Sequence, residues 1–490
     1  MFSLPITLSH THSPPYKRQI ARQIETLICS GRLQEGNRLP SINRMASLLQ
    51  VSKNTIMGAY DLLIDSNLIH SEPSRGFFVA KPTRHGRSRL APDFVLETAH
   101  CSRNLRTSTA QASGVHVPAA SVPVRFDFKI GRPSVHAFPL RQFIYLSNQL
   151  LRYAGSAMAD YPPPEGLWGL RLQIADYLAA SKGILADPDH ILITAGTQES
   201  LSLIAAHFLD ESSCAVHESP GYNGFSHLLA RHRAQGLPVP VDQHGLRTDL
   251  LPRQAVQLAF VTPSHQYPLG HTLSVARRQE LLAWASNSGA LIIEDDYDGD
   301  FCYGPALPAP LKAMSPGQVI YLGSFSKTLG PGLRLGYMVC PPSLSQDFIA
   351  RKALLNNGSP WLTQAVLARF FDEYDYSRHL QYLRRRYLEQ RNTVLQGLKK
   401  VWGNTGTVSG QNAGMHLAFC LPPHSPNADQ VAERALRYGI RLYPLSQAAS
   451  QEADDTNPRH LLFGYANLES RELQLAMQHL ALIQPRLNHD

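Results

Sequence analysis

The segment at residues 323–334 places a lysine among small hydroxyl residues, in the order Gly-Ser-Phe-Ser-Lys-Thr-Leu-Gly-Pro-Gly-Leu-Arg. A lysine that forms an imine with an aldehyde needs a pocket that favours its neutral amine. Hydroxyl groups and an arginine can bind a phosphate, and the segment supplies Ser324, Ser326 and Arg334. An isolated lysine is usually a surface residue, but this spacing is uncommon by chance. The segment therefore predicts that Lys327 is an imine-forming lysine beside a phosphate site.

A second segment, at residues 292–298, carries acidic side chains at the end of an apolar run. A carboxylate at the end of a buried strand, here Asp295, faces a ligand at the carboxyl edge of a sheet. Opposite a pyridine nitrogen, such a carboxylate keeps the nitrogen protonated and makes the ring an electron sink. Two residues further on, the Tyr297 hydroxyl can hydrogen-bond a phenolic oxygen of the same ring. We expect the neighbouring Asp296 and Asp298 to be helix-capping residues instead.

Two further segments predict side chains for the same ligand. Residues 193–199 have the pattern of a strand, a glycine and a helix, and the backbone amides of a helix N-terminus form an anion site. Thr197 and Gln198 would lie at that N-terminus. Tyr222 could stack on an aromatic ring, and a turn-rich loop that contains Tyr267 would line the same edge of the sheet.

The elements that must position these residues are short apolar strands separated by helical stretches. This alternation predicts an α/β domain with a mostly parallel sheet, covered by helices on both faces. The candidate strands are residues 191–194, 215–218, 259–262, 291–294, 319–323 and 336–339.

Composition restricts the class of protein. The apolar content of 43% is ordinary for a soluble globular chain, and no run of about 18 apolar residues predicts a membrane span. The N-terminus lacks the pattern of a secretory signal. The 6 cysteines are scattered and the 21 histidines show no ligand spacing. We therefore expect a reducing cytoplasm, no disulfide framework and no metal site.

The net charge of +8 is concentrated near the N-terminus. Residues 1–90 hold 12 Lys and Arg against 5 Asp and Glu, whereas residues 91–490 hold 34 against 33. This asymmetry is typical of a nucleic-acid-binding module attached to a near-neutral body, although a soluble basic tail would give the same charge.

The first 80 residues have the pattern of a winged helix-turn-helix. Helices are expected over 16–30, from Ser41 and from Ser52, followed by strands at 68–70 and 77–79. In such a module the third helix enters the major groove of DNA. The side chains expected to face the core are Ile20, Ile24, Leu27, Ile28, Met45, Leu48, Leu49, Ile56, Ala59, Tyr60 and Leu63.

Between residues 81 and 124 the pattern changes to Pro, Ser, Thr, Ala and Arg, which is typical of a flexible linker. We therefore expect a DNA-binding domain at 12–80, a linker at 81–124 and a larger ligand-binding domain at 125–490.

The N-terminal module resembles the GntR family of bacterial transcription regulators at residues 30–41, 51–55 and 75–79. Polar residues at the start of its third helix would reach DNA, because Asn can read adenine while Lys and hydroxyl groups mostly contact phosphates. A basic wing tip could enter a narrow minor groove. One departure is Asn43, where the family usually has Arg. The DNA-contacting residues predicted in this way are Ser41, Arg44, Ser52, Lys53, Asn54, Thr55 and Arg75.

The larger domain resembles the fold-type I aminotransferases, which use pyridoxal 5′-phosphate, and the fused arrangement resembles the MocR subgroup of GntR regulators. The resemblance implies a mostly parallel sheet between helices and a smaller C-terminal α+β subdomain. It implies that Lys327 carries the cofactor as an internal aldimine, that Asp295 pairs with the pyridine nitrogen and that Tyr297 contacts the phenolic oxygen. The other cofactor-binding residues that it implies are Thr197, Gln198, Ser324, Ser326 and Arg334 at the phosphate, Tyr222 and Tyr267 at the ring, and Tyr161 from the other subunit of a head-to-tail homodimer.

Two departures concern substrate recognition. Aminotransferases hold the substrate carboxylate with an arginine on a late strand, and in this sequence Leu462 occupies that place. Tyr267 stands where these enzymes usually have Asn. We therefore expect cofactor binding to be retained and amino-acid recognition to be altered.

Three functions remain open. The first is a cytoplasmic, nucleoid-associated regulator that binds promoter DNA and senses pyridoxal phosphate, an amine or an amino acid, which would suit control of vitamin B6 metabolism. The second is a catalytically active aminotransferase with an accessory DNA-binding module. The third is a scaffold that only dimerises that module. Steady turnover of an amino donor and an oxo acid would favour the enzyme, whereas the first function needs at most residual transamination.

Overall fold

The computed structural model describes residues 6, 8, 16–29, 33–65, 68–72, 75–80, 124–135, 137–304, 306–448 and 459–488. The chain divides into two compact units, residues 1–110 and 111–490, which are considered separately. Apart from residue 124, the predicted linker lies outside the described residues, so the predicted domain boundaries stay predictions.

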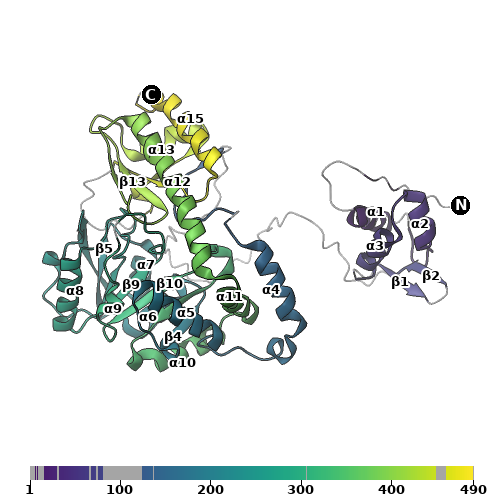
Figure 1. Ribbon diagram of the computed structural model, residues 1–490, viewed down its shortest axis with the longest axis horizontal. Coiled ribbons are helices and arrows are strands. Elements are labelled where there is room, and N and C mark those ends of the chain that lie inside the picture. The colour runs from purple at the N-terminus through teal and green to yellow at the C-terminus, as the bar shows by residue number, and fades with distance from the viewer. Residues whose placement is uncertain are drawn as a thin grey trace, which may run out of the picture. The chain divides into compact units, whose positions relative to one another are not determined.

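The N-terminal unit consists of α1 (Tyr16–Cys29), α2 (Ile42–Leu49), α3 (Lys53–Asp65) and an antiparallel hairpin of β1 (Ile69–Glu72) and β2 (Gly76–Val79) (Figure 1). These are the elements of the predicted winged helix-turn-helix, and their apolar side chains meet in one core.

Leu48 is the exception among the predicted core residues, because its side chain is 61% exposed. The buried stripe of α2 runs through Ile42, Met45, Ala46 and Leu49, and Leu48 lies to one side of it. The prediction that Leu48 points inward was therefore wrong.

The large sheet of the second unit has the strand order β4-β11-β10-β9-β8-β5-β6-β7. The pairings from β10 to β6 are parallel, β11 runs antiparallel between β10 and β4, and β7 forms an edge hairpin with β6. The predicted, mostly parallel sheet is confirmed. Its strands are β4 (Ile191–Thr194), β5 (Cys214–Ser219), β6 (Gln235–Asp242), β7 (Gly245–Leu246), β8 (Leu258–Val261), β9 (Leu291–Asp296), β10 (Val319–Ser324) and β11 (Gly336–Val339).

Helices cover both faces of this sheet (Figure 1). Neighbouring residues of one strand point to opposite faces, so Ile293 packs with one set of helices and Ile292 with another. The first set is α6 (Thr197–Phe208), α7 (Asn223–His232) and α10 (Ser345–Asn356). The other face is covered by α4 (Leu140–Arg152), α5 (Trp168–Lys182), α8 (Val275–Ser288) and α11 (Trp361–Tyr374).

The C-terminal part forms a smaller α+β subdomain (Figure 1). Its antiparallel sheet has the order β12-β13-β16-β15 and packs with α12 (Tyr376–Trp402), α13 (Ala428–Arg437) and α15 (Ser470–Asn488). The strands are β12 (Thr407–Ser409), β13 (His416–Cys420), β15 (Tyr443–Pro444) and β16 (His460–Gly464), and a short parallel pair joins β3 (Phe126–Asp127) to β14 (Ile440–Arg441). Among the described residues, no helix is long and apolar enough to cross a membrane.

Candidate cofactor site and DNA-binding surface

The carboxyl ends of the parallel strands gather the predicted cofactor residues at one edge of the large sheet. β4 ends before Thr197, β5 ends before Tyr222, and β9 ends on the carboxylates beside Tyr297. β10 ends at Ser324, and Ser326 and Lys327 follow within three residues. Since parallel strands present their carboxyl ends to the same side, residues from four separate segments come together there.

Lys327 lies half-buried at this edge, with its Nζ donating to the carbonyl oxygen of Gly131 at 3.0 Å. Burial lowers the pKa of its ammonium group, against the opposing effect of Asp298 and Asp295. Loss of solvation favours the neutral amine, which is the form that can attack an aldehyde. The pocket therefore favours the neutral amine of Lys327, as imine formation requires.

Asp295 is buried, and its Oδ1 atom has no hydrogen-bond partner within the described residues. Burial, and then the charge of Asp296, raise the pKa of its carboxyl group to about 8. A buried polar atom without a partner is costly, so this carboxylate needs a partner from outside the described residues. A protonated pyridine nitrogen fits that need.

The predicted helix-capping role of Asp296 and Asp298 is wrong, because both carboxylates are buried and pair with residues far away in the sequence. Asp296 accepts hydrogen bonds from Lys182 Nζ at 2.7 Å and from Tyr321 Oη at 2.6 Å. Asp298 lies 3.0 Å from His265 Nδ1. They follow a buried strand, and the next helix, α9 (Leu311–Met314), begins well after them.

Three tyrosines surround the space above Asp295. The ring of Tyr267 makes edge contacts with Tyr222 at 5.9 Å and with Tyr297 at 6.0 Å between centroids. The hydroxyl of Tyr222 donates to Gln198 Oε1 at 3.2 Å, and that of Tyr267 donates to the Ala448 carbonyl at 2.9 Å. Tyr267 is thereby tied to α14 (Leu445–Ala448). The rings of Tyr222, Tyr267 and Tyr297 therefore lie next to one another, where a flat aromatic ligand could contact them.

A phosphate cradle forms where β4 meets α6. Thr197 and Gln198 occupy the first turn of α6, whose free amides suit an anion. The guanidinium of Arg334 lies close by, since a Cβ built on Gly196 would be 3.8 Å from its Nη2 atom. Ser324 Oγ accepts the Ser326 amide at 3.1 Å, which fixes the turn before Lys327. These residues fit a phosphate group.

A buried ion pair between Glu199 and Lys352 lies next to this cradle, and the sequence did not indicate it. Glu199 accepts hydrogen bonds from the Ala195 amide and from Lys352 Nζ, which lies at 2.8 Å and is fully buried. The pair fixes the backbone before Gly196 and neutralises a carboxylate that would otherwise repel a phosphate. No local motif marks Lys352, which lies on α10.

Histidines form a second feature that the sequence did not reveal. His265, Asp298 and His416 offer ligand atoms that lie within 4.8 Å of one another, a spacing that could hold a metal ion. Hydrogen bonds already engage them: His265 Nδ1 lies beside Asp298, and His416 Nε2 lies 2.9 Å from the Pro268 carbonyl.

Leu462, at the predicted place of the carboxylate-binding arginine, is fully buried on β16. It packs in a small apolar cluster with Leu269, Ala418 and Leu445. The nearby Arg459 instead donates to the Pro422 carbonyl at 3.4 Å. At the predicted place of that arginine, the structure therefore has a buried apolar side chain.

Tyr161, predicted to act from the other subunit, is 82% exposed.

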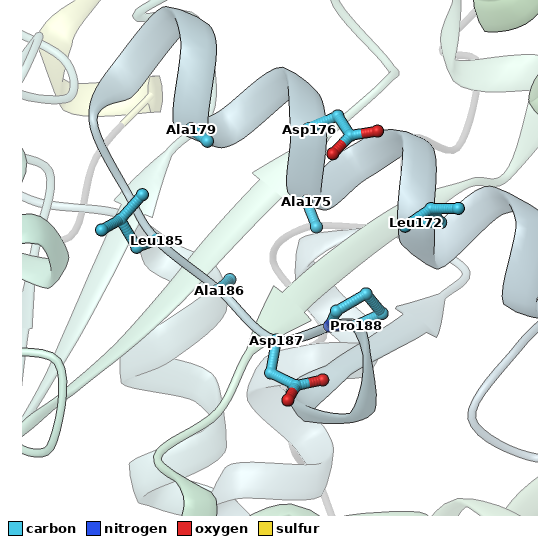
Figure 2. Close-up of a pocket in the computed structure, with 8 residues that line it drawn as sticks. All are labelled: Leu172, Ala175, Asp176, Ala179, Leu185, Ala186, Asp187 and Pro188. Atoms are coloured by element: carbon cyan, nitrogen blue, oxygen red, sulfur yellow. The ribbon is translucent and has the colours of Figure 1, made fainter.

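A separate surface pocket lies along α5 and the segment after it, as Figure 2 shows. Its lining contains none of the predicted cofactor residues, so it is not the cofactor site. The lining residues are Leu172, Ala175, Asp176, Ala179, Leu185, Ala186, Asp187 and Pro188.

The predicted DNA-contacting residues of the N-terminal unit divide into two groups. Ser41 Oγ accepts a hydrogen bond from the Arg44 amide at 3.4 Å, and Ser52 Oγ accepts one from the Thr55 amide at 3.1 Å. Ser52 Oγ is also hydrogen-bonded to the Thr55 hydroxyl. The side chains of Ser41 and Ser52 therefore cap α2 and α3. Arg44, Lys53 and Asn54 are exposed and free to face DNA.

Arg75, at the tip of the wing, is 73% exposed in its side chain and pairs with Glu72 at 2.7 Å. Its guanidinium also lies 5.7 Å from the ring of Phe78. An exposed ion pair of this kind contributes little free energy, so phosphate can compete for the arginine.

Comparison with known proteins finds one family match in each of the two units. Residues 16–79 match the model of the bacterial regulatory proteins of the gntR family, and residues 134–480 match that of aminotransferase class I and II. Among solved structures, the kynurenine aminotransferase of Pyrococcus horikoshii shares the fold, with a TM-score of 0.68 and 24% identity over 74% of this chain and 91% of that one.

The α-aminoadipate aminotransferase LysN of Thermus thermophilus is similar at 27% identity with a TM-score of 0.67, over 74% of this chain and 92% of that one, and its structure holds a phosphopyridoxyl compound. Together with the fit of Lys327, Asp295 and the phosphate cradle, this identifies pyridoxal phosphate as the cofactor.

Curated relatives match over nearly their whole length. The probable rhizopine catabolism regulatory protein MocR of Rhizobium meliloti is 31% identical over 96% of this chain and 94% of its own. The regulator YhdI of Bacillus subtilis is 31% identical over 95% of both chains, and the pyridoxine biosynthesis regulator PdxR of Corynebacterium glutamicum is 30% identical over 88% and 89%. The chain therefore belongs to the GntR family of transcription regulators and, within it, to the MocR subgroup, in which a helix-turn-helix domain is joined to a pyridoxal-phosphate-binding domain of the aminotransferase fold.

Proposed function

We propose that the affinity of this regulator for promoter DNA depends on the ligand bound at Lys327. Pyridoxal phosphate is the ligand that we propose as the signal. The observation that carries the proposal is a cofactor site that keeps Lys327, Asp295 and the phosphate cradle but has Leu462 in place of the carboxylate-binding arginine. Such a site suits recognition of the cofactor, or of an amine that reacts with it, more than turnover of amino acids.

Each group in the site has a separate task in this proposal. Bound pyridoxal phosphate supplies an aldehyde that reacts with amines, and Lys327 presents the neutral amine. Asp295 holds a proton on the pyridine nitrogen, while Arg334 and the start of α6 hold the phosphate. A ligand changes DNA binding only if it binds one arrangement of the protein more tightly than another.

The target genes are proposed from a relative. The similarity to PdxR, whose name assigns it to pyridoxine biosynthesis, supports control of vitamin B6 metabolism. Action on promoter DNA would take place in the bacterial cytoplasm, on the nucleoid.

We further propose a head-to-tail homodimer in which Tyr161 reaches the phosphate of the partner. Support comes from exposed apolar side chains on and around α4 and α5, which a second copy of the chain would cover. These are Leu140 (59% exposed), Ile144 (52%), Met158 (58%) and Leu185 (85%). A dimer also presents two recognition helices to two half-sites.

The test is binding to DNA from upstream of the protein's own gene, at one fixed salt concentration, with cofactor-free and pyridoxal-phosphate-loaded protein. A change in affinity or footprint supports pyridoxal phosphate as the signal. Equal binding by both forms makes it a prosthetic group and directs the search to amines. Absence of specific binding by either form refutes the proposal.

A second candidate is an active aminotransferase, which the fold shared with these enzymes favours. It predicts repeated turnover of an amino donor with an oxo acid. The apolar cluster around Leu462 opposes it, because a substrate carboxylate there would lose its water without gaining a cation.

A further inference from the structure

A buried hydrogen-bonded group stands directly behind Tyr297. His265 Nδ1 lies 3.1 Å from Tyr297 Oη, and the same nitrogen lies 3.0 Å and 3.2 Å from the two oxygens of Asp298. The side chains of His265 and Asp298 are 0% and 2% exposed. Tyr297 itself is only partly buried, since it borders the cofactor space.

The chemistry of these groups fixes where the protons lie. A carboxylate can only accept, so the Nδ1 atom of His265 must carry the proton that it shares with Asp298. Tyr297 Oη, beside the same N–H, then receives part of that hydrogen bond and directs its own proton elsewhere. Burial, and then the charge of Asp298, raise the pKa of Tyr297 well above its ordinary value, so the phenol keeps its proton.

Three glycines hold the His265 ring in this orientation. A Cβ on Gly270 would lie 2.8 Å from His265 Nε2, and one on Gly410 would lie 3.2 Å from the same atom. A Cβ on Gly414 would overlap His265 Cε1 and Nδ1. All three have positive φ values of 75–81°, which glycine adopts without strain. The ring therefore has no room to turn its Nδ1 away from Asp298 and Tyr297.

Other titratable groups face the same cluster. They are Asp295 on β9, Glu218 on β5, Tyr267 and His271 in the loop after β8, Lys327 after β10, and His416 on β13. Burial, followed by the charge of His265, lowers the pKa of His416 to about 4, so His416 is neutral near pH 7. His416 therefore adds no cation that would compete with the N–H of His265.

We propose that His265 and Asp298 are positioning residues for Tyr297. Asp298 orients the Nδ1–H of His265, this N–H donates to Tyr297 Oη, and the phenolic proton of Tyr297 is thereby directed to the phenolic oxygen of bound pyridoxal phosphate. Neither His265 nor Asp298 touches the cofactor in this arrangement. The inference rests on the cofactor site alone, so failure of the proposed DNA control would leave it standing.

The experiment follows the absorbance of the pyridoxal-phosphate-loaded full-length protein across a range of pH, and records the midpoint at which the cofactor band changes. A matched pair of variants separates shape from hydrogen bonding: His265→Asn keeps an N–H near the position of Nδ1, whereas His265→Leu is of similar size and has none. Tyr297→Phe and the double variant Tyr297→Phe/His265→Leu complete a cycle.

His265→Leu should raise the midpoint by about one pH unit, a tenfold change in proton affinity, because a phenolic oxygen that loses a donated hydrogen bond binds a proton more tightly. His265→Asn should stay close to the wild type. In the Tyr297→Phe background, His265→Leu should add nothing, since its effect passes through the Tyr297 hydroxyl.

An unchanged midpoint in His265→Leu overturns the proposal, and so does a shift that adds in full to that of Tyr297→Phe. If His265→Leu does not fold, Asp298→Asn answers the same question, because it weakens the acceptor that orients His265. Because loss of the Asp298 charge also acts directly on the site, Asp298→Asn is measured with and without Tyr297→Phe. A midpoint that rises more in the presence of the Tyr297 hydroxyl supports the proposal, and equal shifts in the two backgrounds overturn it.

Discussion

Replacing Asp295 by asparagine should change the free energy of unfolding and the affinity for pyridoxal phosphate in opposite directions. Without the cofactor, the buried Asp295 carboxylate has an oxygen with no partner among the described residues. Asparagine has nearly the same shape and no charge, so it removes the cost of burying the carboxylate. With the cofactor, the same carboxylate pairs with a pyridinium, and asparagine loses that charge-assisted bond.

The pKa of Asp295 gives the size and the sign of the first effect. Burial and Asp296 raise it from 3.8 to about 8 in the folded protein. Below pH 3.8 the carboxyl is protonated in both states and costs nothing. Between the two values the folded state binds more protons, so stability falls as pH rises, and above pH 8 the cost is constant. At 1.36 kcal/mol per pH unit, it reaches about 4 kcal/mol at pH 7.

The assay is urea unfolding of cofactor-free full-length protein at several pH values, with tryptophan fluorescence as the signal. Asp295→Asn should match the wild type near pH 4 and become progressively more stable toward pH 8. Asp176→Asn is the control, because Asp176 is exposed on α5 (Figure 2), and it should change stability by less than about 0.5 kcal/mol at any pH.

The affinity is measured on the same proteins by equilibrium titration with pyridoxal phosphate, and Asp295→Asn should weaken it about 100-fold, the equivalent of a charge-assisted hydrogen bond of nearly 3 kcal/mol. The reasoning is refuted if the stability difference between Asp295→Asn and wild type does not depend on pH, or if the cofactor binds equally well to both.

Three further predictions concern other parts of the chain. Lys53→Ala should weaken binding to all DNA sequences alike and reduce the slope of log affinity against log salt by about 1, as measured by fluorescence anisotropy. Arg334→Met should raise the Kd for pyridoxal phosphate about tenfold while the circular dichroism spectrum stays unchanged, because it removes the guanidinium beside Gly196. Leu462→Arg should lower the free energy of unfolding by about 3 kcal/mol or more, since its charge would enter an apolar cluster; a variant of wild-type stability that binds amino acids would contradict this.

The strands and the residues that follow them were predictable because their signals are local. β4 and β11 have the bounds that the sequence indicated, and the other candidate strands differ by one or two residues. Each apolar run is short and ends in polar residues or glycine. Asp295 directly follows such a run, and Tyr222 and Lys327 follow theirs within four residues, so a parallel sheet brings all three to one edge whatever the detailed packing.

Local reasoning failed where a side chain depends on a distant partner. Leu48 fits an apolar pattern but lies beside the buried stripe of α2, which was set by how the helices pack. Asp296 resembles a helix cap, yet its partner is Lys182, which lies 114 residues earlier in the chain. The pair between Lys352 and Glu199 spans 153 residues and carries no motif.

The sequence by itself determined the two kinds of domain and the approximate bounds of the strands, and it led to the prediction that Lys327 is the imine-forming lysine, because backbone periodicity and turn residues act over a few positions. Only the tertiary structure decided the direction in which the pKa values of Asp295 and Lys327 shift and the enclosure of His265 by Gly270, Gly410 and Gly414. Burial and electrostatic pairing depend on which remote segments exclude water from a group, and that is settled when the sheet, its helices and the C-terminal subdomain pack together.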